Sequence, residues 1–191
     1  MSRRTIAANV RNKLMNTFSS YEIFKDTRVK AEASRQNDQR PHEVFYFHKV
    51  DDPYSHLTIQ SIKKLQASYD IKLRPILVGS ESLEALHEPT LYNHYCLQDV
   101  QRIAPFYGIE FQAKSYPTKE LVSLANSILS AVNDQNFVDI ATQVSSALWR
   151  GDSVTLDEIS SSYFATTSQV KEKLKSGNEI RNGKGYYFGS A

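Results

Sequence analysis

The sequence predicts a mixed α/β fold built on one βαβ unit, and two strands with a helix between them carry this prediction. Residues 43–50 are rich in β-branched and aromatic side chains, which favour strands. Residues 71–78 alternate between apolar and polar side chains and are followed by Gly79, so we expect a second strand there. Because a helix separates the two strands, they should be parallel, with a right-handed crossover.

The helix of this unit is predicted to begin at Asp52-Pro53, directly after the first strand. Aspartate is a favoured N-cap residue because its carboxylate accepts hydrogen bonds from the first turn, and proline is well tolerated at the first helical position. Leu57, Ile62 and Leu65 fall on or near one face of this helix, with Tyr69 near its end. Helix capping alone therefore accounts for the Asp-Pro pair.

Helices are predicted on both sides of the βαβ unit. An apolar stripe marks residues 4–18, and the highly charged residues 25–40 form a solvated helix or linker ending at Pro41. We therefore divide the chain into an N-terminal helical extension, 1–41, and a domain, 42–191. In the domain the middle and late segments have helical patterns: 81–88, 90–107, 117–132, 137–151, 152–161 and 167–175.

The end of the domain is predicted to leave its sheet incomplete. Gly177 and Asn178 suit the end of the last helix, and residues 185–191 look like the beginning of a further strand. A sheet that stops there has an open edge. We therefore expect that the chain is a fragment, or that a following domain or a partner chain completes the sheet.

Composition limits the classes of function. The net charge of +2, from 23 basic and 21 acidic residues, gives no electrostatic case for nucleic acid. The apolar runs are far shorter than the ~20 residues that span a bilayer, so we expect no membrane segment. Cys96 is the only cysteine, which excludes an intrachain disulfide and dithiol redox chemistry. A lone thiol fits a reducing compartment such as the cytoplasm.

The first residues leave a second localisation open. Residues 1–21 contain no acidic side chain, and their charged residues are Arg3, Arg4, Arg11 and Lys13. An Arg-rich, acid-free start is typical of organelle transit peptides, but an ordinary surface helix has the same composition. We favour the surface helix.

Several other polar and aromatic residues have an ordinary structural interpretation. His48 and His56 flank the Asp52 turn and could form an acid–base pair with a carboxylate, although we expect both rings to be partly exposed. No histidine pair has the spacing of a metal site. We interpret Cys96 as a buried, inert thiol. The aromatic side chains of the middle segment are predicted to be core rather than a ligand site: Tyr92, Tyr95, Tyr107, Tyr116 and Trp149.

The segment Val44–Leu57, which contains Asp52-Pro53-Tyr54-Ser55, resembles the first strand and active-site turn of the DsbA-like thioredoxin superfamily. It is most similar to kappa-class glutathione transferases, 2-hydroxychromene-2-carboxylate isomerases and DsbA-like domain proteins with an N-terminal helical extension. The stretch 81–176 is placed like the helical insertion of that superfamily, and Ala147–Asp152 resembles a segment near its end. The resemblance implies a thioredoxin-like fold with a helical insertion.

The resemblance also implies a site. Glutathione and a small electrophile would meet at the start of the first helix, with Asp52 and Ser55 as catalytic residues. Pro53, Tyr54, His48 and His56 would bind glutathione. The sequence departs from the family twice: Asp52 stands where the enzymes place a serine, and Phe188–Ala191 provides no proline where they carry a cis-proline.

Elementary electrostatics makes Asp52 a poor substitute for that serine. An ionised carboxylate has no proton to donate to sulfur and repels a thiolate, and a helix N-terminus keeps it ionised. Ser55 could still offer a hydroxyl. Two functions stay open: a glutathione-dependent isomerase or transferase relative, and a non-catalytic thioredoxin-like binding or assembly domain.

Overall fold

The computed structural model describes residues 12–13, 15–16, 20–79 and 88–185. The chain divides into two compact units, 1–42 and 43–191, and each is described by itself. The first unit contains helix α2 (Tyr21–Asn37), whose N-cap is Ser20. No side chain of α2 is buried, and a bidentate ion pair joins Arg35 to Glu32, with a closest approach of 2.6 Å. The helical stripe predicted at 4–18 lies mostly outside the described residues.

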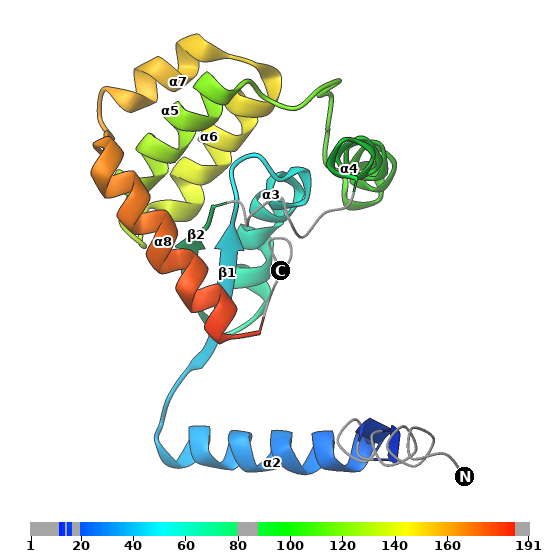
Figure 1. The fold of residues 1–191 in the computed structure, drawn as a ribbon. Coiled ribbons are helices and arrows are strands. Elements are labelled where there is room, and N and C mark those ends of the chain that lie inside the picture. The colour runs from blue at the N-terminus through cyan, green and yellow to red at the C-terminus, as the bar shows by residue number, and fades with distance from the viewer. Residues whose placement is uncertain (1–11, 14, 17–19, 80–87, 186–191) are drawn as a thin grey trace, which may run out of the picture. The chain divides into compact units, whose positions relative to one another are not determined.

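The predicted βαβ unit is confirmed, and the fold is mixed α/β (Figure 1). Strand β1 (His42–His48) and strand β2 (Ile71–Leu77) form a two-stranded parallel sheet, with helix α3 (Pro53–Ser68) between them in the chain. The main-chain N–H of Val78 donates to the carbonyl of His48 over 2.9 Å, just beyond β2. In the described part of the chain, no third strand joins this sheet.

The other regular elements in the described part of the second unit are helices (Figure 1). Helices α5, α6 and α7 pack on one another, α6 also packs on α3, and α8 lies against α5 and β2. The main core forms where these elements meet, around Ile59, Leu77, Ile128 and Leu148, all at most 1% exposed. The bounds, in chain order, are α4 (Pro89–Ile103), the 3₁₀ helix η2 (Ala104–Tyr107), α5 (Lys119–Ala131), α6 (Phe137–Arg150), α7 (Ser153–Ser160) and α8 (Thr167–Gly183).

The predicted end of the last helix is wrong, because α8 continues through Gly177 and Asn178 to Gly183. A Cβ atom at position 177 would lie 2.0 Å from the carbonyl oxygen of Leu77. Glycine is therefore needed for the close approach of α8 to β2 and not for a helix stop. Asn178 also contributes to this contact, since its Oδ1 accepts a hydrogen bond of 3.0 Å from the N–H of Gly79.

Two predicted elements fall where the structure gives no description. The short helix at 81–88 and the strand at 185–191 lie almost wholly outside the described residues. The incomplete sheet therefore stays a prediction.

Candidate functional site

The turn between β1 and α3 is closed by side chains of its own residues. Asp52 is the N-cap of α3 and Pro53 occupies the first helical turn, as predicted. Oδ2 of Asp52 accepts a hydrogen bond of 2.8 Å from the N–H of Ser55 and another of 2.9 Å from the Ser55 hydroxyl. Beside them, the Lys49 ammonium pairs with Asp51 over 3.0 Å.

Ser55 is held inside this turn and is 0% exposed. While its Oγ donates to Asp52, it also accepts a hydrogen bond of 3.2 Å from the N–H of Lys49. The hydroxyl therefore serves as donor and acceptor within the chain, and it ties the end of β1 to the first turn of α3. Catalytic roles for Asp52 and Ser55 stay predictions.

The two histidines that flank the turn are buried, so the expectation of partial exposure is wrong. His48 is 0% exposed, and its Nδ1 lies 2.7 Å from the hydroxyl of Tyr46. His56 is 5% exposed, and its Nδ1 lies 2.8 Å from the hydroxyl of Ser145 on α6. Tertiary neighbours cover both rings: Phe137 packs against His48, and Phe111 and Trp149 pack against His56.

Burial also sets the charge state of both histidines. Loss of hydration lowers the pKa of His48 to about 3, with a smaller effect of His56. Burial lowers the pKa of His56 to about 4, and the positive charge of Arg150 acts in the same direction. Both rings are therefore neutral at pH 7. Nε2 of His48 has no hydrogen-bond partner within the described residues.

Tyr54 faces helix α4 rather than the interior of the turn. Its hydroxyl donates a hydrogen bond of 2.7 Å to Oδ2 of Asp99, and its ring packs against a small apolar cluster around Leu57 and Val100. Partial burial and the Asp99 carboxylate raise the pKa of Tyr54 well above its ordinary value. The phenol is therefore protonated at all physiological pH values.

Cys96 belongs with Tyr54 to this part of the site, and the sequence alone did not predict that. Its thiol is buried and interacts with the hydroxyls of Tyr92 and Tyr54. Burial raises the pKa of Cys96, and the Asp52 carboxylate adds to the effect. The thiol is therefore uncharged at pH 7, in accord with an inert cysteine. The spacing of Tyr92 and Cys96, one helical turn apart on α4, was the signal available in the sequence.

Tyr116, which lies in the segment between η2 and α5, also belongs with Cys96 and Asp52. Burial raises its pKa, and the negative charge of the Asp52 carboxylate raises it further. Burial likewise raises the pKa of Tyr92 to about 12. We call these residues, with Tyr54 and Asp99, the tyrosine–thiol cluster: Asp52, Tyr54, Tyr92, Cys96, Asp99 and Tyr116.

The predicted core role of the middle aromatic residues is only partly correct. Trp149 is buried and Tyr116 is half-buried, but the side chains of Tyr92, Tyr95 and Tyr107 are exposed. Helix α4 contacts α3 and η2, which leaves much of its outer surface to solvent. The helical period predicted helix α4 correctly. It could not show that much of the outer surface of α4 has no other element packed on it.

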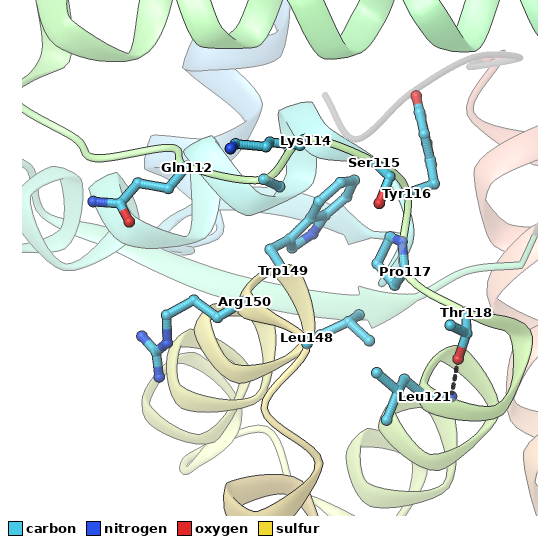
Figure 2. Close-up of a pocket in the computed structure, with 12 residues that line it drawn as sticks. Gln112, Lys114, Ser115, Tyr116, Pro117, Thr118, Leu121, Leu148, Trp149 and Arg150 are labelled. Atoms are coloured by element: carbon cyan, nitrogen blue, oxygen red, sulfur yellow. Dashed lines mark hydrogen bonds between the residues drawn. The ribbon is translucent and has the colours of Figure 1, made fainter.

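A pocket of about 430 Å³ opens beside the tyrosine–thiol cluster (Figure 2). Tyr116 and Trp149 line it together, with ring centroids 5.6 Å apart, and Trp149 also lies 6.1 Å from the ring of His56. In Figure 2 the hydroxyl of Tyr116 points away from Pro117 and Trp149. The lining residues are Gln112, Ala113, Lys114, Ser115, Tyr116, Pro117, Thr118, Leu121, Leu148, Trp149, Arg150 and Gly151.

No protein-family model matches the chain, and no curated protein matches it. In the described ranges, histidine, cysteine and acidic side chains form no group of three that could hold a metal ion. None of the helices described is both long and apolar enough to cross a membrane.

Proposed function

We propose that this chain is a DsbA-like, thioredoxin-type protein related to glutathione-dependent isomerases and transferases, without dithiol redox activity. The proposal places its site at the N-terminus of α3, and glutathione and a small electrophile are the proposed ligands. A βαβ unit whose turn reads Asp52-Pro53-Tyr54-Ser55 supports it. The single cysteine supports the exclusion of dithiol chemistry and a cytoplasmic location.

The tyrosine–thiol cluster is the observation that carries this proposal. Tyrosine phenols with the ordinary pKa of about 10 keep their protons at neutral pH, and partial burial raises the pKa of Tyr92 and of Tyr116 further above that value. A phenol that keeps its proton can donate a hydrogen bond to the sulfur of a thiol ligand, and such a bond favours the thiolate. In this proposal the tyrosines supply the donor that Asp52 cannot supply.

Asp52 has a different role in this proposal. Its Oδ2 accepts from the N–H and hydroxyl of Ser55, so the carboxylate satisfies one of the free N–H donors of the helix N-terminus. The same negative charge disfavours a second anion nearby, as it already does for Cys96. We therefore expect the wild-type chain to bind glutathione weakly.

A second candidate follows from how completely the turn uses its own polar groups. Ser55 is buried, and its hydroxyl has a donor and an acceptor inside the chain. A turn of this kind offers no hydroxyl to a ligand and suits a non-catalytic binding or assembly domain. A following domain or partner chain that completes the sheet would fit the same candidate.

Calorimetric titration of glutathione separates the two candidates. We would compare the full chain with Asp52→Ser, and with Asp152→Ser as a matched control, because Asp152 caps α7 by the same pattern. Weak binding that strengthens about tenfold in Asp52→Ser and not in Asp152→Ser supports the glutathione site. Loss of that binding in Tyr116→Phe would assign the donor.

The opposite results are equally informative. If neither the full chain nor folded Asp52→Ser binds glutathione at millimolar concentration, the glutathione proposal is wrong and the binding domain is the better account. Circular dichroism of each variant establishes that it is folded.

A further inference from the structure

The pocket beside Trp149 has a polarity of its own. Lys114 and Arg150 are the charged side chains of its lining, which contains no carboxylate. Arg150 also reaches Ser146 and Asp152, the latter over 3.7 Å, whereas Lys114 has no ion pair among the described residues. The apolar side chains of the lining include Pro117, Leu121, Leu148 and Trp149, and Figure 2 shows the first three on the other side of Trp149 from Lys114 and Arg150. The pocket therefore suits an apolar group with negative charge next to it.

The segment 110–117, which lines one wall of the pocket from Gln112 onward, has unpaired main-chain groups. It belongs to no helix or strand and connects η2 with α5 (Figure 1). Within the described part of the chain, no main-chain N–H from Glu110 to Tyr116 donates a hydrogen bond. Its one paired carbonyl is that of Ala113, which accepts a hydrogen bond of 2.8 Å from Nε2 of Gln101. The wall therefore has donors and acceptors available for another main chain.

Trp149 supplies one more unpaired group. Its Nε1 is buried and has no hydrogen-bond partner within the described residues. Figure 2 shows the nitrogen-bearing edge of the indole on the side of Ser115 and Pro117. This nitrogen is closed to solvent, so a ligand in the pocket does not contact it in this conformation.

From the polarity of the pocket and the unpaired main chain of its wall we infer that segment 110–117 and the Trp149 pocket bind an extended peptide segment of a partner protein. The peptide main chain pairs with the free N–H and C=O groups of 110–117, one apolar side chain enters the pocket, and acidic neighbours face Lys114 and Arg150. Main-chain pairing gives affinity in this mode of recognition, and the pocket gives specificity. The inference goes beyond the proposed function, and neither depends on the other.

Trp149 makes the test direct, because it is the only tryptophan of the chain and lines the pocket. Its fluorescence would be followed while the full chain is titrated with three heptapeptides. Each has a central leucine in a threonine background, and the flanking pair is glutamate, serine or lysine. A fourth probe repeats the glutamate peptide with alternate main-chain nitrogens methylated. The compact aromatic anion 8-anilinonaphthalene-1-sulfonate is the fifth.

We expect the glutamate peptide to bind most tightly and the lysine peptide least. Methylation should weaken binding by about tenfold or more, because it removes several main-chain hydrogen bonds. Lys114→Glu should reverse the preference between the glutamate and lysine peptides. The matched control Lys72→Glu, which makes the same charge change at an exposed position of β2, should leave that preference unchanged.

Four results would overturn the inference. Equal binding of the methylated and unmethylated peptides would exclude main-chain pairing. An equal effect of Lys72→Glu and Lys114→Glu would show attraction by net charge alone. Binding of the sulfonate without binding of any peptide, or no change of Trp149 emission with any probe, would exclude a peptide site.

Discussion

Two turns of this molecule have the same local chemistry but different surroundings. The α3 turn reads Asp52-Pro53-Tyr54-Ser55 and the α7 turn reads Asp152-Ser153-Val154-Thr155. In each, the aspartate is the N-cap and accepts hydrogen bonds from the N–H and the hydroxyl of the residue three positions on. The Asp152 carboxylate pairs with Arg150 over 3.7 Å, whereas Asp52 acts on Cys96 and Tyr116.

This comparison shows that the Asp-x-x-Ser/Thr pattern by itself reports helix capping. The α7 turn carries that pattern without a cysteine or tyrosine acting on its carboxylate. Any function of the α3 turn must therefore come from residues that other segments bring to it. The α7 turn is accordingly the internal control for every experiment on the α3 turn.

The largest expected difference between the two turns is in the stability that each loses at acidic pH. The residue four positions after the cap is His56 in α3 and Leu156 in α7, and both are buried. Burial lowers the pKa of His56 from 6.5 to about 4, so the unfolded chain binds more protons between these values. Its contribution to stability is complete above pH 6.5 and is lost as the pH falls toward 4, by roughly 3 kcal/mol.

The substitution His56→Leu, which copies α7, tests this account. Urea unfolding at pH 7, 5.5 and 4 should show a shallower loss of stability for the variant than for the wild type. Part of the slope that remains comes from His48, whose pKa is lowered to about 3, and part from carboxylates with lowered pKa such as Asp152. The same substitution at the exposed His94 should leave the slope unchanged. Identical slopes for wild type and His56→Leu would exclude His56 as an acid-sensitive group.

The next largest effect on stability should come from the hydroxyl three positions after the cap, which belongs to Ser55 in α3 and to Thr155 in α7. Ser55→Ala leaves the Lys49 N–H without its acceptor inside the protein, and we expect a loss of about 2 kcal/mol. Thr155→Ala removes a hydroxyl that is only half-buried, so water replaces it and the loss should stay below about 1 kcal/mol. Urea midpoints at pH 7 measure both; equal losses would mean that Ser55 is an ordinary cap residue.

Residue patterns could predict the elements of this fold but not their neighbours. The βαβ unit, the Asp52 cap and the helix α6 follow from local propensity and period, and the structure contains them. The continuation of α8 through Gly177 could not be predicted, because the reason for this glycine is the carbonyl of Leu77, 100 positions earlier in the chain. Sequence-local rules assign such a glycine to a helix end.

The candidate site shows the same limit. The turn residues Asp52 to Ser55 were identifiable from their order in the chain, whereas Tyr92, Cys96 and Tyr116 reach them only through tertiary packing. The burial of His48 and His56 was missed for the same reason. Each ring is covered by side chains far along the chain, Phe137 for the first and Phe111 and Trp149 for the second.

A smaller contrast in stability is expected two positions after the cap, at Tyr54 in α3 and Val154 in α7. Tyr54→Phe removes the hydrogen bond to Asp99, and we expect a loss of about 1 kcal/mol. Val154 is 67% exposed, so Val154→Ala should change stability by no more than about 0.5 kcal/mol. If Tyr54→Phe is as neutral as Val154→Ala, the Tyr54–Asp99 bond does not fix α4 against α3.

The smallest effect on stability should come from the position directly after the cap, where one substitution makes the two turns alike. Proline fits the first helical position of α3, and Ser153 occupies that position in α7, where it is exposed. Ser153→Pro should raise stability by about 0.5 kcal/mol, because proline restricts the unfolded chain and the N–H it removes has no helical partner. A thermal scan against wild type measures this gain. A loss would mean that the backbone before Ser153, with ψ of 85° at Asp152, does not accept proline, and that the two turns differ in conformation as well as in surroundings.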